Sequence, residues 1–148
     1  MRKIELQGKL LNHIMQNGNK STGEKLLLNS FKNLQQDCNK RTKEIFKLAI
    51  INTTPVFKIH TIKNKKMKKK KRKVKEIPVF ITNQQLRSSL ALKLILKTLK
   101  KSPSFFSSFT SEILLSSQSK SNSIELKDLI QKQVLNQKKY FRFFRWVS

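Results

Sequence analysis

The segment Lys63–Lys73 reads KNKKMKKKKRK, in which nine of eleven side chains are cationic and none is acidic. Like charges at this density repel one another unless counter-charge is supplied, and a nucleic acid supplies it at a matching spacing. Two apolar segments rich in β-branched and aromatic residues, Val56–Ile62 and Val74–Ile81, flank the run. Because Pro55 and Pro78 disfavour helix there, the pattern predicts a β-hairpin with a lysine-rich tip. A flexible basic linker is the alternative.

Composition sets the class of protein and its partner. The 148 residues include 33 Lys and Arg against eight Asp and Glu, a formal net charge of +25. Since 37% of residues are hydrophobic, we expect one domain over residues 1–148, with the hairpin extending from it at about 56–81. The charge indicates RNA or DNA as partner. We expect no membrane partner, because the sequence has neither a basic amphipathic helix, a lipid anchor nor an apolar run of about eighteen residues.

The residues that usually carry catalysis or metal binding are sparse. Cys38 is the single cysteine and His13 and His60 are isolated, so we expect no metal site. The sequence has no glycine-rich phosphate loop and no Ser-His-Asp or Cys-His arrangement that we could support. Glu24 and Glu44 fit positions at helix starts, where a carboxylate interacts with the helix dipole. We therefore expect no enzyme activity and no cofactor.

Three helices are predicted before the hairpin. The first covers about residues 4–17 and ends at Gly18. Ser21 and Glu24 fit a capping box that begins the second helix. Thr42 caps the third, which ends before the proline that precedes the hairpin. The apolar positions of the three are Leu6, Leu10, Leu11, Ile14 and Met15; Leu27, Phe31 and Leu34; and Ile45, Phe46, Leu48, Ala49 and Ile51.

Three more helices are predicted after the hairpin. Leu86–Leu99 is strongly periodic, with cations on its other sides. The serine-rich stretch 101–123 has the composition of a linker, but its phenylalanines keep helical spacing, so we predict a fifth helix at about 104–116. Ser123 caps the sixth, which continues to Val134. The predicted fold is therefore mainly α, a bundle of about six helices with a β-hairpin between the third and fourth.

The C-terminal segment Lys138–Trp146 interleaves four cations with five aromatic residues. Such a mixture can stack on bases and pair with phosphates. The alternative is that these aromatics pack on the helical bundle, and both can hold at once.

Five short motifs occur in the order found in one protein family. Asn12–Thr22 is similar to N-x-x-M-x-x-G-K-K-x-T, Ala49–Pro55 to A-x-x-N-x-x-P and Ile77–Val79 to V-P-V. Ser89–Lys93 is similar to S-L-A-x-R, and Phe141–Trp146 to F-x-H-x-R-W. Together they span about 135 residues. The chain thus resembles ribosomal protein seven of the small subunit, in its bacterial and organellar form.

The chain departs from that pattern at several points. Asn19 replaces the first lysine of the first motif, and Phe143 replaces the histidine of the last. Lys138 stands where the terminal motif has asparagine. The lysine-rich run replaces a glycine pair and a tyrosine at the hairpin tip, and the basic arm before the first helix is reduced to Met1–Lys3. The serine-rich stretch is most like mitochondrial members, so we expect a mitochondrial rather than a plastid ribosome.

The resemblance implies a protein that binds small-subunit ribosomal RNA in the head, with its hairpin directed to the exit-site transfer RNA and the messenger path. It also implies neighbouring ribosomal proteins of the head and platform as partners, protein eleven among them, and no homo-oligomer. The residues expected to contact RNA are Lys20, Lys63, Lys65, Lys66, Lys68, Lys69, Lys70, Lys71, Arg72, Lys73, Arg87, Lys93, Lys138, Lys139, Arg142, Arg145 and Trp146.

A second function class stays open on residues alone. Lys69–Val74 is similar to a nuclear-import signal. The alternative is therefore a free-standing basic protein that compacts DNA or RNA, including in the nucleus. Such a protein would not need the ordered motifs.

Overall fold

The computed structural model describes residues 6–15, 17–37, 42–63, 74–99 and 104–137. Within these ranges are six α-helices and one two-stranded antiparallel sheet, with the strands between the third and fourth helices. This confirms the predicted fold class. The elements are α1 (Leu6–Ile14), α2 (Lys20–Asp37), α3 (Thr42–Thr53), β1 (Phe57–Lys63), β2 (Val74–Phe80), α4 (Gln84–Leu99), α5 (Phe105–Ser117) and α6 (Asn122–Asn136).

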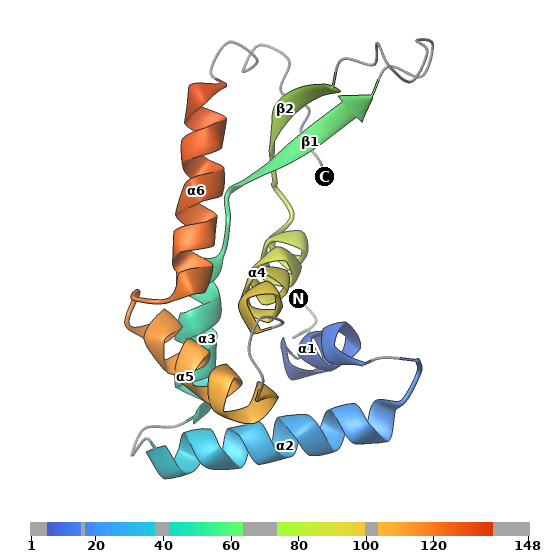
Figure 1. Ribbon diagram of the computed structural model, residues 1–148, viewed down its shortest axis with the longest axis vertical. Helices are drawn as coiled ribbons and strands as arrows, with labels where there is room; N and C mark the ends of the chain where they lie inside the picture. Colours follow the sequence, from blue (N-terminus) through green and yellow to red (C-terminus); the bar gives the residue numbers. More distant parts are fainter. Residues whose placement is uncertain (1–5, 16, 38–41, 64–73, 100–103, 138–148) are drawn as a thin grey trace.

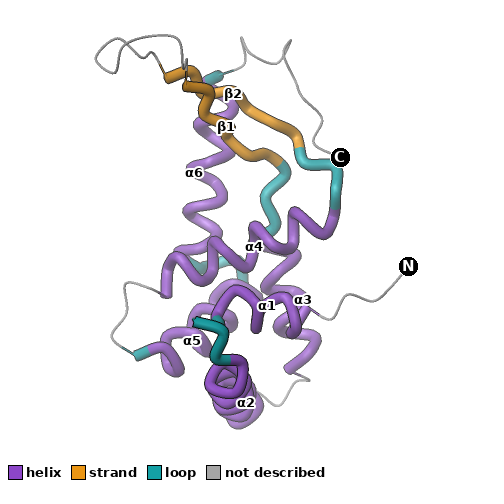
Figure 2. Tube along the Cα trace, turned by 90° about the vertical axis from the view of Figure 1, so that its right-hand side faces the viewer, coloured by secondary structure: helices purple, strands orange, loops and turns teal. Residues whose placement is uncertain are grey.

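The helices form a body from one end of which the hairpin extends. α2 lies across the opposite end, α6 runs up toward the hairpin, and α4 occupies the middle with α1 beside it (Figure 1). A view from the side places α2 and the hairpin at opposite ends of the molecule (Figure 2). None of the described helices is long and apolar enough to cross a membrane.

The apolar face of α4 forms the centre of the core. Ala91, Leu92 and Ile95 are completely buried, and Leu99 is nearly so. α1, α3, α5 and α6 all contact this helix. Burying a leucine or isoleucine contributes about 1.5–3 kcal/mol, so four buried positions on one helix are a large share of a small domain's stability.

Aromatic contacts connect the helices on the other side of the core. Phe31 of α2 meets Phe46 of α3 and Phe109 of α5 edge to face, with ring centroids 5.5 and 6.3 Å apart. Each such pair contributes about 0.5–1.5 kcal/mol beyond the area it buries. Gly23 of α2 lies against Leu11 of α1, where an added Cβ would sit 3.0 Å from the leucine Cδ1. The glycine therefore lets the two helices approach closely.

The helix starts differ from the predicted ones. α1 ends at Ile14, three residues before the predicted end, and Asn17 and Gly18 form the turn that follows, with φ of 52° and 75°. The Ser21 capping box is wrong, because α2 begins at Lys20 and Ser21 lies inside it. Asn19 precedes the helix instead, and its backbone oxygen accepts from the Thr22 hydroxyl at 2.9 Å. Its side-chain oxygen accepts from the Ser21 hydroxyl at 3.1 Å.

Three further details of the prediction are corrected. Thr42 is the first helical residue of α3 and not its cap. Ser121 caps α6 in place of Ser123, its hydroxyl accepting from the Ile124 N–H. Leu48 and Ile51 of α3 are 51% and 57% exposed, so these two apolar positions do not belong to the core.

Asn52 joins three helices at the point where the chain leaves α3 for the hairpin. Its side-chain amide donates to the carbonyl oxygens of Ser116 and Ser117 at 3.0 and 3.1 Å. These carbonyls lie at the end of α5, where the helix itself supplies no donor, and the Ser116 oxygen also accepts from the Ser119 N–H at 3.2 Å. The backbone oxygen of Asn52 accepts from the Lys127 ammonium of α6. One side chain and one carbonyl thus set the direction in which β1 begins.

Replacing this side chain tests the junction. Asn52→Ala removes one donor from each of two helix-end carbonyls, of which Ser116 keeps the Ser119 N–H, and we expect the free energy of unfolding to fall by about 1–3 kcal/mol. Urea denaturation followed by circular dichroism measures the change. Asn29→Ala, at an exposed position of α2, is the matched control. An equal fall in the free energy of unfolding in both variants would contradict the role of Asn52 at this junction.

Candidate nucleic-acid interface

Most of the cations predicted to contact RNA lie outside the described residues. Four lie among the described residues: Lys20 begins α2, Lys63 ends β1, and Arg87 and Lys93 lie on α4. Lys20 is exposed and pairs with Glu24 at 3.6 Å. The other predicted residues lie outside the described ranges: Lys65, Lys66, Lys68, Lys69, Lys70, Lys71, Arg72, Lys73, Lys138, Lys139, Arg142, Arg145 and Trp146.

Arg87 anchors the base of the hairpin. Its Nε donates to the Ile81 carbonyl oxygen at 2.6 Å, and its guanidinium lies over the Phe80 ring, 5.1 Å from the centroid. Phe80 in turn meets Phe57 of the paired strand at 5.7 Å. Stacked arginine keeps its charge, and one bonded nitrogen leaves further N–H groups on the fork. Arg87 therefore positions the base of the hairpin.

Cations gather where α1 meets α4. The Lys9 ammonium of α1 donates to the Gln85 carbonyl of α4 at 3.3 Å. One turn further, His13 Nε2 lies 2.8 Å from the Ser89 hydroxyl. Burial lowers the pKa of His13 below its ordinary value of 6.5, and the positive charges of Lys93 and Lys9 lower it further. The two lysines thus act on the same imidazole, one from α4 and one from α1.

Two cations that the prediction omitted continue this surface. Lys58 of β1 and Lys97 of α4 line a cleft together with Lys93. The four-residue spacing of Lys93 and Lys97, which places both on one side of a helix, is the signal that could have found the pair. We call Lys9, Lys58, Lys93 and Lys97 the cationic face. Neither α1 nor α4 contains an acidic residue, so a polyanion meets no acidic side chain on these two helices.

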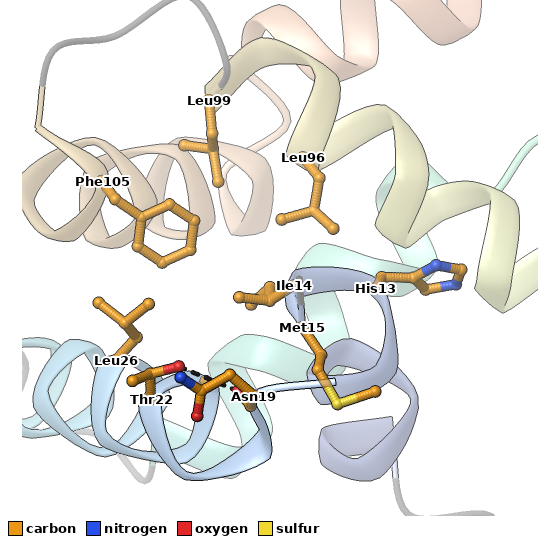
Figure 3. Close-up of a pocket in the computed structure, with 10 residues that line it drawn as sticks. His13, Ile14, Met15, Asn19, Thr22, Leu26, Leu96, Leu99 and Phe105 are labelled. Atoms are coloured by element: carbon orange, nitrogen blue, oxygen red, sulfur yellow. Dashed lines mark hydrogen bonds between the residues drawn. The ribbon is translucent and has the colours of Figure 1, made fainter. Parts of the chain in front are cut away.

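A second cavity, of about 320 Å³, lies between α1, α2, α4 and α5. Its walls include Ile14, Leu26, Leu99 and Phe105 (Figure 3). His13 is the one ionisable residue of its described lining, and its ring points away from the cavity centre toward α4. Because the described lining of this cavity contains no lysine or arginine, the cavity does not suit phosphate.

Residues 2–138 match the family described as ribosomal protein S7p/S5e. The chain belongs to this family. It is 27% identical over 143 residues to small ribosomal subunit protein uS7 of Pseudothermotoga lettingae, covering 95% of this chain and 87% of the relative. It is 26% identical over 133 residues to the uS7c protein of Tetradesmus obliquus, covering 88% and 76%. It is 30% identical over 96 residues to that of Euglena longa, covering 65% and 51%.

The S7p/S5e family is a structural, non-enzymatic kind of protein. Membership of this family therefore supports a structural role for the chain in the small ribosomal subunit. Two of the three relatives have the chloroplast-type name uS7c, which links the chain to organellar members without separating mitochondrion from plastid. In the part of the chain that the structure describes, no three His, Cys, Asp or Glu side chains gather as metal ligands.

The structure explains why the S7-like motifs have these residues. In the motif before the hairpin, Ala49 is buried and Asn52 binds the end of α5. In the α4 motif, Ser89 bonds His13 of the first motif and Ala91 packs in the core. Lys93 of the same motif is exposed. Of the motif positions named here, Ala49, Asn52, Ser89 and Ala91 build the scaffold, whereas Lys93 faces solvent.

The lowered pKa of His13 predicts a pH dependence of stability. A histidine whose folded-state pKa is lowered stabilises the fold above about pH 6.5, and this contribution is lost as the pH falls toward the folded-state pKa. We expect the melting temperature of the RNA-free protein to fall less between pH 7 and pH 5 in His13→Gln than in the native chain. Asn12→Gln, an exposed change on the same helix, should keep the native pH dependence. Parallel melting curves for native chain and His13→Gln would refute the assignment.

Proposed function

We propose that this chain binds small-subunit ribosomal RNA in the head of the subunit and supports translation as a structural constituent. The family match over residues 2–138 carries the proposal. The cationic face supports it. Three of its four lysines lie on α1 and α4, and neither of these helices contains an acidic residue. Each lysine that neutralises a phosphate releases counterions, which favours binding at moderate salt.

The lysine-rich run would add the largest block of charge. β1 and β2 pair from Phe57 with Phe80 to Lys63 with Val74, so residues 64–73 connect the outer ends of the two strands. Arg87 fixes the inner end, and the Gln137 amide donates to Glu76 of β2 at 3.0 Å. A hairpin held at its base can carry its tip away from the body. We propose that the tip approaches the exit-site transfer RNA and the messenger path.

Further partners follow from the same proposal. The C-terminal segment 138–148, with its cations and aromatics, would add further RNA contacts. Neighbouring proteins of the head and platform, protein eleven among them, would complete the surroundings. We place the chain in a mitochondrial ribosome in preference to a plastid one.

Domain transcripts test the RNA assignment. Transcripts of the head and body domains of small-subunit ribosomal RNA are titrated separately with the full chain at fixed salt and magnesium, with duplex DNA as a third ligand. We expect the head transcript to bind at least tenfold more tightly than either competitor, because folded RNA presents a specific arrangement of phosphates and loops. Equal affinity for all three would support the free-standing basic protein instead.

The lysine-rich run predicts a steep salt dependence. If six to nine cations each engage a phosphate, the logarithm of the association constant falls with the logarithm of salt at a slope of about −4 to −8. Replacing Lys68, Lys69, Lys70 and Lys71 with Gln should flatten the slope by about 3. The control replaces four exposed lysines of α2, α3 and α6, namely Lys32, Lys43, Lys47 and Lys132, and has the same net charge. Equal salt-dependence slopes in the two variants would show that the lysine-rich run does not contact the RNA.

A further inference from the structure

The cleft between β1, α4 and α6 has a feature that phosphate binding alone does not require. It has a volume of about 270 Å³, and its lining is almost entirely apolar. Phe57 and Ile59 of β1, Leu90 and Leu94 of α4, and Ile130 of α6 form its walls. In Figure 1, β1 begins beside α6 and extends above α4. Water gains few hydrogen bonds in such a space, so an apolar group that fills it is favoured.

Three lysines surround these apolar walls. Lys58, Lys93 and Lys97 belong to the lining, yet all three are exposed and the lining is almost wholly apolar. They therefore contribute their methylene stems to the cleft and carry their ammonium groups at its mouth. Lys93 and Lys97 are one helical turn apart on α4, and Lys58 comes from the strand. The described lining contains no acidic residue.

A ligand that fits must combine a small flat apolar part with negative charge beside it. The cleft is slightly smaller than the usual range of small-molecule sites, about 300–1,000 Å³, which excludes a partner helix and suits one or two small rings. A nucleotide has this combination, since its base has an apolar face and its phosphates are anionic. RNA-binding proteins commonly take up unstacked bases on aromatic side chains in this way.

We propose that this cleft takes up one unstacked base of the bound RNA, while Lys58, Lys93 and Lys97 hold the phosphates on either side. The inference rests on the RNA binding proposed above and adds a site for a base to it. Phe57 offers the aromatic ring, and the aliphatic residues of α4 enclose the base from the other side. With such a site, the chain should bind a strand that carries bases more tightly than a strand that lacks them.

The test compares two strands of equal charge. The full chain is titrated with a twelve-nucleotide oligoadenylate and with an abasic phosphodiester strand of the same length. We expect Leu94→Trp, which fills the cleft and keeps the charge, to weaken oligoadenylate binding about tenfold, the order expected for one stacked base. Binding of the abasic strand should stay within twofold. Leu28→Trp, at a 61% exposed position of α2, should change neither affinity.

A second variant and a second readout keep the test decisive. Lys97→Gln should weaken both strands by the same factor, because it removes a phosphate contact and leaves the cleft open. Circular dichroism melting shows whether each variant folds. If Leu94→Trp does not fold, ultraviolet crosslinking of the native chain to oligouridylate, followed by peptide mass spectrometry, should place the adduct in β1 or α4.

Two outcomes would overturn the base site. The first is that Leu94→Trp weakens the binding of both strands equally, or weakens neither. The cleft would then be a contact site for a neighbouring protein. The second is a crosslink confined to other segments. Failure of the proposed function would look different: the chain would discriminate base-bearing from abasic strands but would not prefer the head transcript.

Discussion

Burial of one face of α4 is the constraint on which the rest of this structure depends. Ala91, Leu92, Ile95 and Leu99 lie in the core, and four other helices pack around them. A helix buried on one side must expose the other, and here the exposed side carries Lys93 and Lys97. The same 16-residue helix thus holds the body together and presents charge to a partner. Any change that rotates α4 would move both surfaces at once.

The direction of the hairpin depends on a small set of polar contacts at helix ends. Asn52 joins the ends of α3 and α5, and Arg87 joins the start of α4 to the chain after β2. The buried Glu112 accepts the Ser123 N–H at 2.9 Å, which fixes the start of α6 against α5. A carboxylate at a helix N-terminus is favoured by the helix dipole. These contacts give a two-stranded hairpin, which is marginal alone, a rigid base.

Periodicity and turn chemistry made most of the fold predictable. Apolar spacing places all six helices within a few residues, and the segments beside Pro55 and Pro78 correspond to β1 and β2. The cap of α6 was missed because neighbouring serines compete for one role, and the sequence alone does not choose between Ser121 and Ser123. The exposure of Leu48 was missed because apolar residues lie on more than one side of this helix, and their spacing does not say which side meets the core.

The site was predictable only in part. Lys93 stands in a recognisable motif and is exposed, as an RNA contact requires. Lys58 and Lys97 could not be grouped with it, since the cleft exists only where a strand and two helices meet. Arg87 was expected on RNA, but sequence did not show that it also stacks on Phe80. Contacts between residues distant in the chain depend on tertiary packing, which periodicity does not encode.

The central claim is that this chain is a structural component of the small ribosomal subunit, held there by RNA. Sedimentation of the epitope-tagged full chain from a fractionated organelle lysate tests it most directly, with and without magnesium and ribonuclease. The account predicts that the chain moves with the small subunit and leaves that fraction when the RNA is cut. A chain that stays in the light fractions, or that follows DNA, would contradict it.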